Sequence, residues 1–326
     1  MLFSVFMFAI GLVLLIKGGD WFVDGATGIA KRFNLPDIVV GATVVSIGTT
    51  LPEVMVSTTG ALAGSGAMAY GNAIGSIICN TALIAAISIT VNPGPVNVKS
   101  MKTPVIFFFC SAAIYCLAAY ILGTVPRWLG FVMLTVFVAY MLVTVRNGMR
   151  NPDAAAEEEE EEGEKKEKKL WQELVLLVVG AAVIAVGADL LVDHGQKIAL
   201  GLGVPETVVA LLFVALGTSL PELVTTITSL KKGRASLGVG NVIGANVFNL
   251  VLVSGVAVSL APFDVPVENT LLDTGLNLSL VFDIPVMLGV MLLMCVPALA
   301  KKKLSRWQGI ALLCIYAGFC VCQFML

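Results

Sequence analysis

Apolar runs of about twenty residues recur from one end of this chain to the other, and they constrain its fold more than any other feature. Each run is long enough to cross the roughly 30 Å of a bilayer's hydrocarbon as a helix. Because backbone groups in lipid must satisfy one another, we expect an all-α integral membrane protein. Hydrophobic residues make up 58% of the 326 residues and charged ones only 13%, which excludes an ordinary soluble domain. We predict ten transmembrane helices, at roughly 2–31, 37–62, 70–92, 103–122, 127–146, 170–199, 206–229, 236–260, 282–299 and 306–325.

One charged stretch divides these runs into two groups of five. It reads NPDAAAEEEEEEGEKKEKK and covers residues 151–169. We interpret it as a solvated linker, with a regulatory or cation-concentrating role as the alternative. The sequence then predicts a first five-helix repeat at 1–147, an acidic linker at 148–169 and a second five-helix repeat at 170–326, which together form one transport domain.

The positions of the basic residues predict the orientation in the membrane. Seventeen of the twenty Lys and Arg residues fall on one side of the ten predicted spans; Arg127 and Lys197 fall on the other, and Lys17 lies within the first run. Positive charge accumulates on the cytoplasmic side of membrane proteins. We therefore expect a multi-pass protein of the cell membrane, with a cytoplasmic acidic loop and both termini outside.

The two halves carry the same pair of motifs, and both motifs recur at the same distance in sequence. That distance, from Glu53 to Glu222, is called the repeat offset below. Gly48–Glu53 reads GTTLPE and Gly217–Glu222 reads GTSLPE; each is followed by a second motif, GNAIGSIICN at 71–80 and GNVIGANVFN at 240–249. Since each half has an odd number of spans, the second half must enter the membrane from the opposite side. The sequence thus predicts inverted-topology repeats, with Glu53 and Glu222 near a pseudo-two-fold axis at mid-depth.

The paired motifs combine groups that suit a hard cation. A carboxylate in an apolar span is costly and usually functional. Proline removes an amide donor, so we expect broken helices at both motifs, with freed carbonyl groups beside the hydroxyl groups and carboxylates. Such an oxygen cage matches Ca²⁺, which takes about 6–8 oxygen ligands. A soft metal would prefer Cys or His, and the single histidine, His194, lies outside the motifs.

Each polar position also has a structural interpretation. Glu53 and Glu222 could belong to loops or to ion pairs, although neither motif contains a basic residue. Hydroxyl groups in membrane helices often bond to their own helix, an alternative that applies to Thr49, Thr50, Thr218 and Ser219. Asparagines such as Asn80 and Asn249 can link helices.

Two further sets of repeated residues are placed outside the site. The pairs Gly71/Gly75 and Gly240/Gly244 have a spacing that favours close helix packing. Four aspartates recur in register near the ends of the first and sixth runs, where capping and solvation explain them as well as an entry path does: Asp20, Asp24, Asp189 and Asp193.

The paired motifs resemble the two alpha-repeats of the cation/calcium exchanger superfamily, in particular the prokaryotic sodium/calcium exchangers. The resemblance covers nearly the whole chain. It implies exchange of extracellular Na⁺ for intracellular Ca²⁺, commonly three for one, as a two-helix gate slides over a cluster of four ion sites.

Carried over by motif position, the resemblance implies a set of ion ligands. Ca²⁺ would be held by the carboxylates of Glu53 and Glu222 and by the backbone carbonyls of Thr49 and Thr218. Na⁺ would also use the carbonyls of Ser46 and Ala215, the hydroxyls of Thr49, Ser76 and Thr218, and the two glutamates. Thr50 and Ser219 would line the same cavity, and Asn80 and Asn249 would complete the central position.

Two positions depart from the pattern of that family. Asn249 stands where some relatives have an acidic residue, a change that goes with K⁺-independence in the family. Ala245 stands where relatives often have serine, opposite Ser76 in the repeat. One Na⁺ site would then lack a hydroxyl ligand, which leaves the three-to-one stoichiometry open.

We therefore expect an electrogenic Na⁺/Ca²⁺ antiporter that exports Ca²⁺ by alternating access. An H⁺-coupled antiporter on the same scaffold is the nearest alternative; an intramembrane enzyme using Glu53 and Glu222, and a passive channel, are further ones. No nucleophile, metal cluster or phosphate loop accompanies the carboxylates in the sequence, which argues against an enzyme. We expect no cofactor, no nucleic-acid partner and no obligate protein partner, so that a monomer in the lipid bilayer would suffice.

Overall fold

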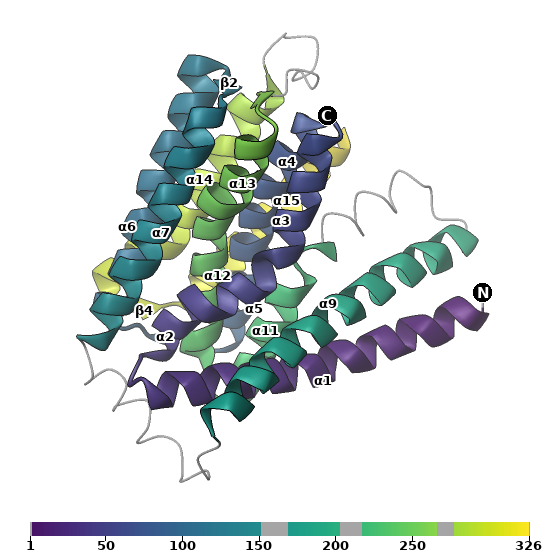
Figure 1. Cartoon of the computed structure of the whole chain (residues 1–326), viewed down its shortest axis with the longest axis vertical. Helices are drawn as coiled ribbons and strands as arrows, with labels where there is room; N and C mark the ends of the chain where they lie inside the picture. Colours follow the sequence, from purple (N-terminus) through teal and green to yellow (C-terminus); the bar gives the residue numbers. More distant parts are fainter. Residues whose placement is uncertain (1, 151–168, 203–216, 266–276, 326) are drawn as a thin grey trace.

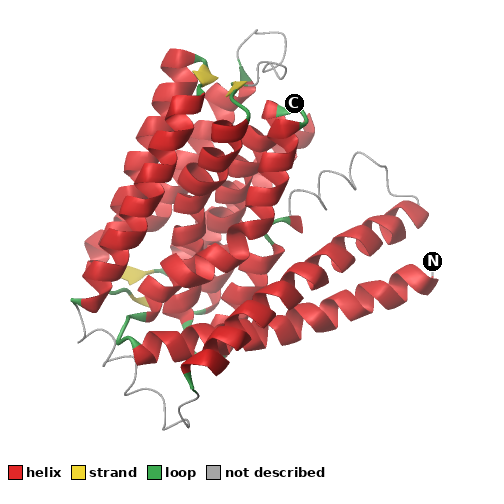
Figure 2. Cartoon of the chain, viewed as in Figure 1, coloured by secondary structure: helices red, strands yellow, loops and turns green. Residues whose placement is uncertain are grey.

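The structure is a computed structural model that describes residues 2–150, 169–202, 217–265 and 277–325. Almost all of these residues are helical (Figure 2), and several helices contain a segment of wider π-helix, labelled η. The first half contains α1 (Leu2–Arg32), α2 (Asp37–Val40), η1 (Gly41–Val45), α3 (Ser46–Leu62), α4 (Gly66–Cys79), η2 (Asn80–Ala85), α5 (Ala86–Val91), α6 (Val98–Leu117), η3 (Ala118–Leu122) and α7 (Arg127–Met149). The second half contains α9 (Leu170–Gly201), α11 (Leu220–Lys231), α12 (Ala235–Phe248), η4 (Asn249–Val253), α13 (Ser254–Leu260), η6 (Ser279–Asp283), α14 (Ile284–Lys301) and α15 (Arg306–Met325).

Eight helices in the described part of the chain are long and apolar enough to cross a membrane. They correspond to eight of the ten predicted spans and confirm a helical membrane protein. The predicted span at 306–325 forms the helix α15. The span at 206–229 falls partly outside the described residues, as does most of the acidic linker. The count of ten spans therefore remains a prediction.

Helices α1 and α9 form a long antiparallel pair set at an angle to the other helices (Figure 1). A Cβ atom added at Gly11 would lie 2.9 Å from the carbonyl oxygen of Gly187, and one added at Gly18 would lie 3.1 Å from that of Gly180. The two glycines on each helix lie about two turns apart, so they share a face and let the two backbones approach closely. Applying the repeat offset exchanges the two contacts, because Gly11 maps to Gly180 and Gly18 to Gly187.

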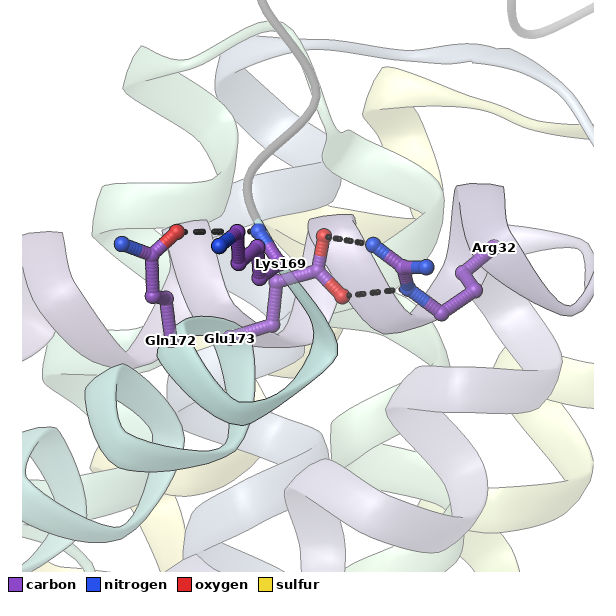
Figure 3. Close-up of polar contacts among 4 residues, drawn as sticks. All are labelled: Arg32, Lys169, Gln172 and Glu173. Carbon is purple, nitrogen blue, oxygen red and sulfur yellow. Dashed lines mark hydrogen bonds and ion pairs between the residues drawn. The ribbon is translucent and has the colours of Figure 1, made fainter.

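Charged side chains join α1 to the start of α9 and to the end of α11. Arg32 Nε lies 3.0 Å from Glu173 Oε2, which joins the end of α1 to the start of α9 (Figure 3). Lys232, directly after α11, lies 2.9 Å from Asp24 Oδ1 and donates to the backbone carbonyl of Asp20 at 2.8 Å. Asp20 and Asp24 thus hold α1 against the end of α11, which agrees with their placement outside the site.

We expect Gly180→Ala to weaken the packing of α1 on α9. The added methyl group would lie 2.5 Å from the backbone nitrogen of Phe22, and the helices must separate to accept it. Overpacking of this kind costs about 1–3 kcal/mol. Thermal unfolding of the purified protein in detergent should show a lower midpoint. Gly318→Ala in α15 is the matched control, since a Cβ atom there meets no described atom within 4 Å; an equal shift in both variants would contradict the packing argument.

The centre of the helix bundle is α12, of whose fourteen residues twelve are buried. Gly240 and Gly244 face α2 and η1 so closely that a Cβ atom would collide with the backbone at Ile38 and Ala42, which confirms the predicted packing role of this pair. A Cβ atom at Gly71 or Gly75 meets no described atom within 4 Å. The repeat equivalents of Ile38 and Ala42 fall at positions 207 and 211, outside the described residues.

A buried ion pair joins the two halves beside α12. Arg234, at the N-cap of α12, contacts both carboxylate oxygens of Asp37 at 3.0 Å, and both side chains are almost completely buried. Asp37 begins α2, whose helix continues into the first motif. This pair therefore fixes the entry of the motif helix against the central helix.

The repeat in the sequence is also a repeat of local structure. The π segments η2 and η4 begin at Asn80 and Asn249, which the repeat offset relates to each other. Two short antiparallel pairs connect the halves: β1 (Gly94–Pro95) with β4 (Lys303–Leu304), and β2 (Thr124–Val125) with β3 (Phe263–Asp264). Each pair joins one strand from each half.

The expected helix break at the first motif is wrong. The chain stays helical from Asp37 to Leu62 with Pro52 inside α3, and it adapts earlier, in the π segment η1. Side chains satisfy two carbonyl groups of η1: Ser46 Oγ donates to Gly41 O at 2.8 Å, and Tyr140 Oη donates to Ala42 O at 2.6 Å. At the second motif, Thr218 and Ser219 do form a turn, after which α11 begins.

Candidate cation site

Glu53 and Glu222 are both completely buried, one in the middle of α3 and the other in the first turn of α11. None of their four carboxylate oxygens forms a hydrogen bond within the described part of the chain. Nor does either glutamate form an ion pair with a described basic residue. The two carboxyl groups lie close enough to interact electrostatically. The alternative of structural ion pairs is therefore wrong for the described residues.

Two further repeat pairs share this condition. The side chains of Asn80 and Asn249 are completely buried, and neither their amide nitrogens nor their oxygens have a hydrogen-bond partner among the described residues. The hydroxyl groups of Thr50 and Ser219 are also buried without such a partner. Buried polar atoms in folded proteins are almost always paired. Several unpaired buried oxygens therefore indicate that a ligand binds to them. Two carboxylates among them favour a cation.

The packing of the helices brings together the elements from both halves that carry these residues. Helix α3, which carries Glu53, packs on η4, which begins with Asn249; helix α11, which carries Glu222, packs on η2, which begins with Asn80. A π segment leaves carbonyl groups that ordinary helical bonds do not use, which is why such segments occur at functional sites.

The other predicted ligands lie at the border of this cluster. Ser46 is completely buried; its hydroxyl group donates to Gly41 O at 2.8 Å and lies 3.0 Å from Asn241 O. Thr49 is buried in α3, and Ser76 is buried in α4. Thr218 is half-buried in the turn before α11. Ala215 lies outside the described residues, so its predicted role stays a prediction.

Asn72 and Asn241, which the sequence analysis did not single out, each contact one of these threonines. Thr49 Oγ1 donates to Asn241 Oδ1 at 3.2 Å, and Thr218 Oγ1 donates to Asn72 Oδ1 at 3.4 Å. Each contact crosses from one half to the other. Their polar side chains within apolar spans, repeated at the same offset, were the signal that could have identified them.

A cavity of about 870 Å³ separates the α1–α9 pair from the two motifs. Its walls include Gly48 and Pro52 of the first motif and Gly217, Thr218 and Pro221 of the second, while Phe22 and Val192 face them from the helix pair. Asp189 is the only charged residue among its described lining. The cavity thus lies between the two motifs and the α1–α9 pair.

Comparison with known proteins agrees with this arrangement. The family profile described as "Sodium/calcium exchanger protein" matches residues 3–146 and 173–325. The chain is 34% identical over 320 residues to the uncharacterized membrane protein MJ0091 of Methanocaldococcus jannaschii, covering 97% of this chain and 96% of that protein. It is 30% identical over 348 residues to the sodium/calcium exchanger MaX1 of Methanosarcina acetivorans, covering 97% of each.

A solved structure shows the same fold. The sodium-calcium exchanger NCX_Mj, soaked with 2.5 mM Na⁺ and 10 mM Sr²⁺, superimposes with a TM-score of 0.79 at 32% identity, over 97% of both chains. The match extends over both motif-bearing halves. By its profile, its relatives and its fold, the chain belongs to the sodium/calcium exchanger family.

Proposed function

We propose that this protein is a Na⁺/Ca²⁺ antiporter that binds either Ca²⁺ or Na⁺ at the cluster around Glu53 and Glu222. One observation carries the proposal: three repeat-related pairs of polar side chains are buried without a hydrogen-bond partner among the described residues. The pairs are Glu53 with Glu222, Thr50 with Ser219, and Asn80 with Asn249. Exchange of cations, including Ca²⁺, is the activity that the names of the relatives support.

The ligand set that we propose follows the resemblance. Ca²⁺ takes the two carboxylates together with the backbone carbonyls of Thr49 and Thr218. Na⁺ uses the same carboxylates and adds the hydroxyl groups of Thr49, Thr218 and Ser76 and the carbonyls of Ser46 and Ala215. Because the two ions share ligands, their binding is mutually exclusive.

The two buried carboxylates also explain why transport is coupled. Ionised and empty, they are too costly to carry through a dehydrated intermediate, whereas one Ca²⁺ or several Na⁺ neutralise them. An exchange of three Na⁺ for one Ca²⁺ moves one net charge, worth about 2.3 kcal/mol per 100 mV. An inside-negative potential then drives Ca²⁺ out of the cell. The cycle needs no covalent chemistry and no cofactor.

We further propose ten spans in two inverted repeats, with a cytoplasmic acidic loop. The antiparallel glycine contacts between α1 and α9, the strand pairs between halves and the matching starts of η2 and η4 support this topology. We propose that the pair α1–α9 is the moving gate, since residues of both helices line the cavity beside the two motifs.

Uptake of ⁴⁵Ca²⁺ into proteoliposomes tests this function. Vesicles loaded with Na⁺ and diluted into Na⁺-free buffer at constant pH should accumulate Ca²⁺, and an inside-positive potential should increase the uptake. Vesicles loaded with K⁺ or choline should not accumulate it. Uptake driven by a proton gradient alone would show the H⁺-coupled alternative, and uptake without any opposing gradient would show a channel.

Ala245→Ser should strengthen Na⁺ binding. Ala245 is completely buried in α12 at the repeat position of Ser76, and serine there restores the hydroxyl ligand of the related exchangers. A hydrogen-bond-sized gain of about 1 kcal/mol corresponds to roughly a fivefold lower half-saturating Na⁺ concentration for Ca²⁺ release from vesicles. Ser76→Ala should change that concentration in the opposite direction. No change in either variant would remove both positions from the Na⁺ sites.

A further inference from the structure

Two hydrogen bonds cross between the halves at the border of the cation site, and each is the repeat image of the other. Thr49 Oγ1 donates to Asn241 Oδ1 at 3.2 Å, and Thr218 Oγ1 donates to Asn72 Oδ1 at 3.4 Å. The repeat offset relates Thr49 to Thr218, and it relates Asn72 to Asn241 in the same way. A contact that recurs in both halves, with its partners exchanged, has a role common to both.

The direction of these bonds decides what each threonine can offer a cation. A hydroxyl group has one proton and two acceptor lone pairs. When the proton is donated to an amide oxygen, the lone pairs remain for a positive ion. A hydroxyl group without that acceptor can turn its proton toward the ion, and it must then be reoriented before it binds.

The Asn72 side chain is itself held in place. Asn72 Nδ2 donates to Ser57 Oγ at 2.8 Å and to the backbone carbonyl of Glu53 at 3.3 Å. A carbonyl oxygen only accepts, so this end of the amide is the nitrogen, and Oδ1 faces Thr218. Asn241 is completely buried, and its Oδ1 accepts from Thr49 Oγ1 at 3.2 Å. Ser46 Oγ lies 3.3 Å from the same oxygen, but its single proton goes to Gly41 O at 2.8 Å.

We propose that Asn72 and Asn241 are positioning residues that orient the Thr218 and Thr49 hydroxyl groups for Na⁺. The inference rests on the proposed function, in which Na⁺ uses these hydroxyl groups while Ca²⁺ uses the backbone carbonyls of the same threonines. Removing an asparagine oxygen therefore weakens the Na⁺ sites and spares the Ca²⁺ site. The two asparagines set the affinity for the coupling ion without touching either ion.

The test compares two kinds of flux in the same vesicles. Asn241→Leu and Asn72→Leu remove the acceptor oxygen at similar side-chain volume. Each should raise the half-saturating Na⁺ concentration for Na⁺/Ca²⁺ exchange about tenfold, as the loss of one oriented ligand predicts. The rate of Ca²⁺/Ca²⁺ self-exchange should stay within about twofold of the unmodified protein, which corresponds to a change below about 0.4 kcal/mol. An equal loss of both fluxes would overturn the proposal.

A double-variant cycle separates positioning from general damage. If Asn241 acts through the Thr49 hydroxyl group, Thr49→Val combined with Asn241→Leu should be no worse for Na⁺ than Thr49→Val alone. Additive losses would overturn the proposal. Asn72 is half-buried, so Asn72→Leu with Thr218→Val gives a second cycle if the buried Asn241 variant does not fold.

Asn246→Leu is the matched control. Asn246 lies in the same helix as Asn241, is completely buried, and donates to a hydroxyl group of the other half, Thr81 Oγ1, at 2.7 Å, but Thr81 is not a proposed ion ligand. Its loss should lower stability and leave the Na⁺ dependence unchanged; a matching rise in half-saturating Na⁺ would overturn the proposal. If the unmodified protein showed Ca²⁺/Ca²⁺ self-exchange but no response to Na⁺, that result would instead contradict Na⁺ as the coupling ion.

Discussion

Replacing Glu53 or Glu222 by glutamine should abolish Ca²⁺ exchange while leaving the protein folded. Glutamine keeps the size of the side chain and can form hydrogen bonds, but it removes one of the two negative charges that a Ca²⁺ ion needs. The carboxylates are completely buried and unpartnered among the described residues, so no other group there compensates for the loss. Removing one member of a buried charge arrangement costs about 3–5 kcal/mol, which corresponds to a loss of affinity of at least about a hundredfold. ⁴⁵Ca²⁺ uptake from Na⁺-loaded vesicles measures the effect.

Glu173→Gln provides the matched control for this result. Glu173 is also a buried glutamate within a membrane-spanning helix, but it pairs with Arg32 at the end of α1 and lies outside the cluster (Figure 3). Its substitution should lower stability and leave exchange measurable. Normal flux in Glu53→Gln or Glu222→Gln would remove that carboxylate from the site.

Arg234→Met should cause a large loss in the free energy of unfolding. The guanidinium group binds both oxygens of Asp37 at 3.0 Å in a buried position. Methionine fills a similar volume but leaves the Asp37 carboxylate buried without this cation, at a cost of about 3–5 kcal/mol. Unfolding in mixed micelles with increasing SDS, followed by tryptophan fluorescence, measures the loss.

A second substitution shows whether the cost comes from the uncompensated charge. Asp37→Leu combined with Arg234→Met removes both charges, and replacing a buried pair by apolar side chains is often close to neutral. The double variant should therefore recover most of the stability lost by Arg234→Met. A double variant as unstable as the single one would mean that the pair supports the fold through its shape or its other contacts.

Much of the fold could be predicted from the sequence because lipid leaves few alternatives. Apolar runs in a membrane must be helical, and eight predicted spans agree with the described helices to within a few residues. The internal repeat also predicted which residues form the candidate cation site. Glu53 and Glu222 are expensive in hydrocarbon, and their symmetric placement left few alternatives to a shared site.

Other features depend on contacts between distant segments, which no local pattern reveals. The hydrogen bond from Tyr140 to the carbonyl group of Ala42 in η1, for example, joins residues far apart in the chain. The bond between Arg234 and Asp37 joins residues whose repeat equivalents do not form such a pair in the sequence, since Ser65 stands opposite Arg234. The hydrogen bonds of Asn72 and Asn241 likewise join each asparagine to a threonine of the opposite half.

Equilibrium Ca²⁺ binding under competition with Na⁺ tests the central claim, that one cluster holds either ion. Purified protein in detergent would be equilibrated with ⁴⁵Ca²⁺ over a range of Na⁺ concentrations at constant pH and ionic strength, with Glu53→Gln/Glu222→Gln as the blank. We expect saturable binding of one Ca²⁺ per chain, complete displacement by Na⁺ with a steeper than hyperbolic dependence, and no binding to the double variant. Ca²⁺ that stays bound at saturating Na⁺, or that binds the double variant normally, would contradict a shared site at Glu53 and Glu222.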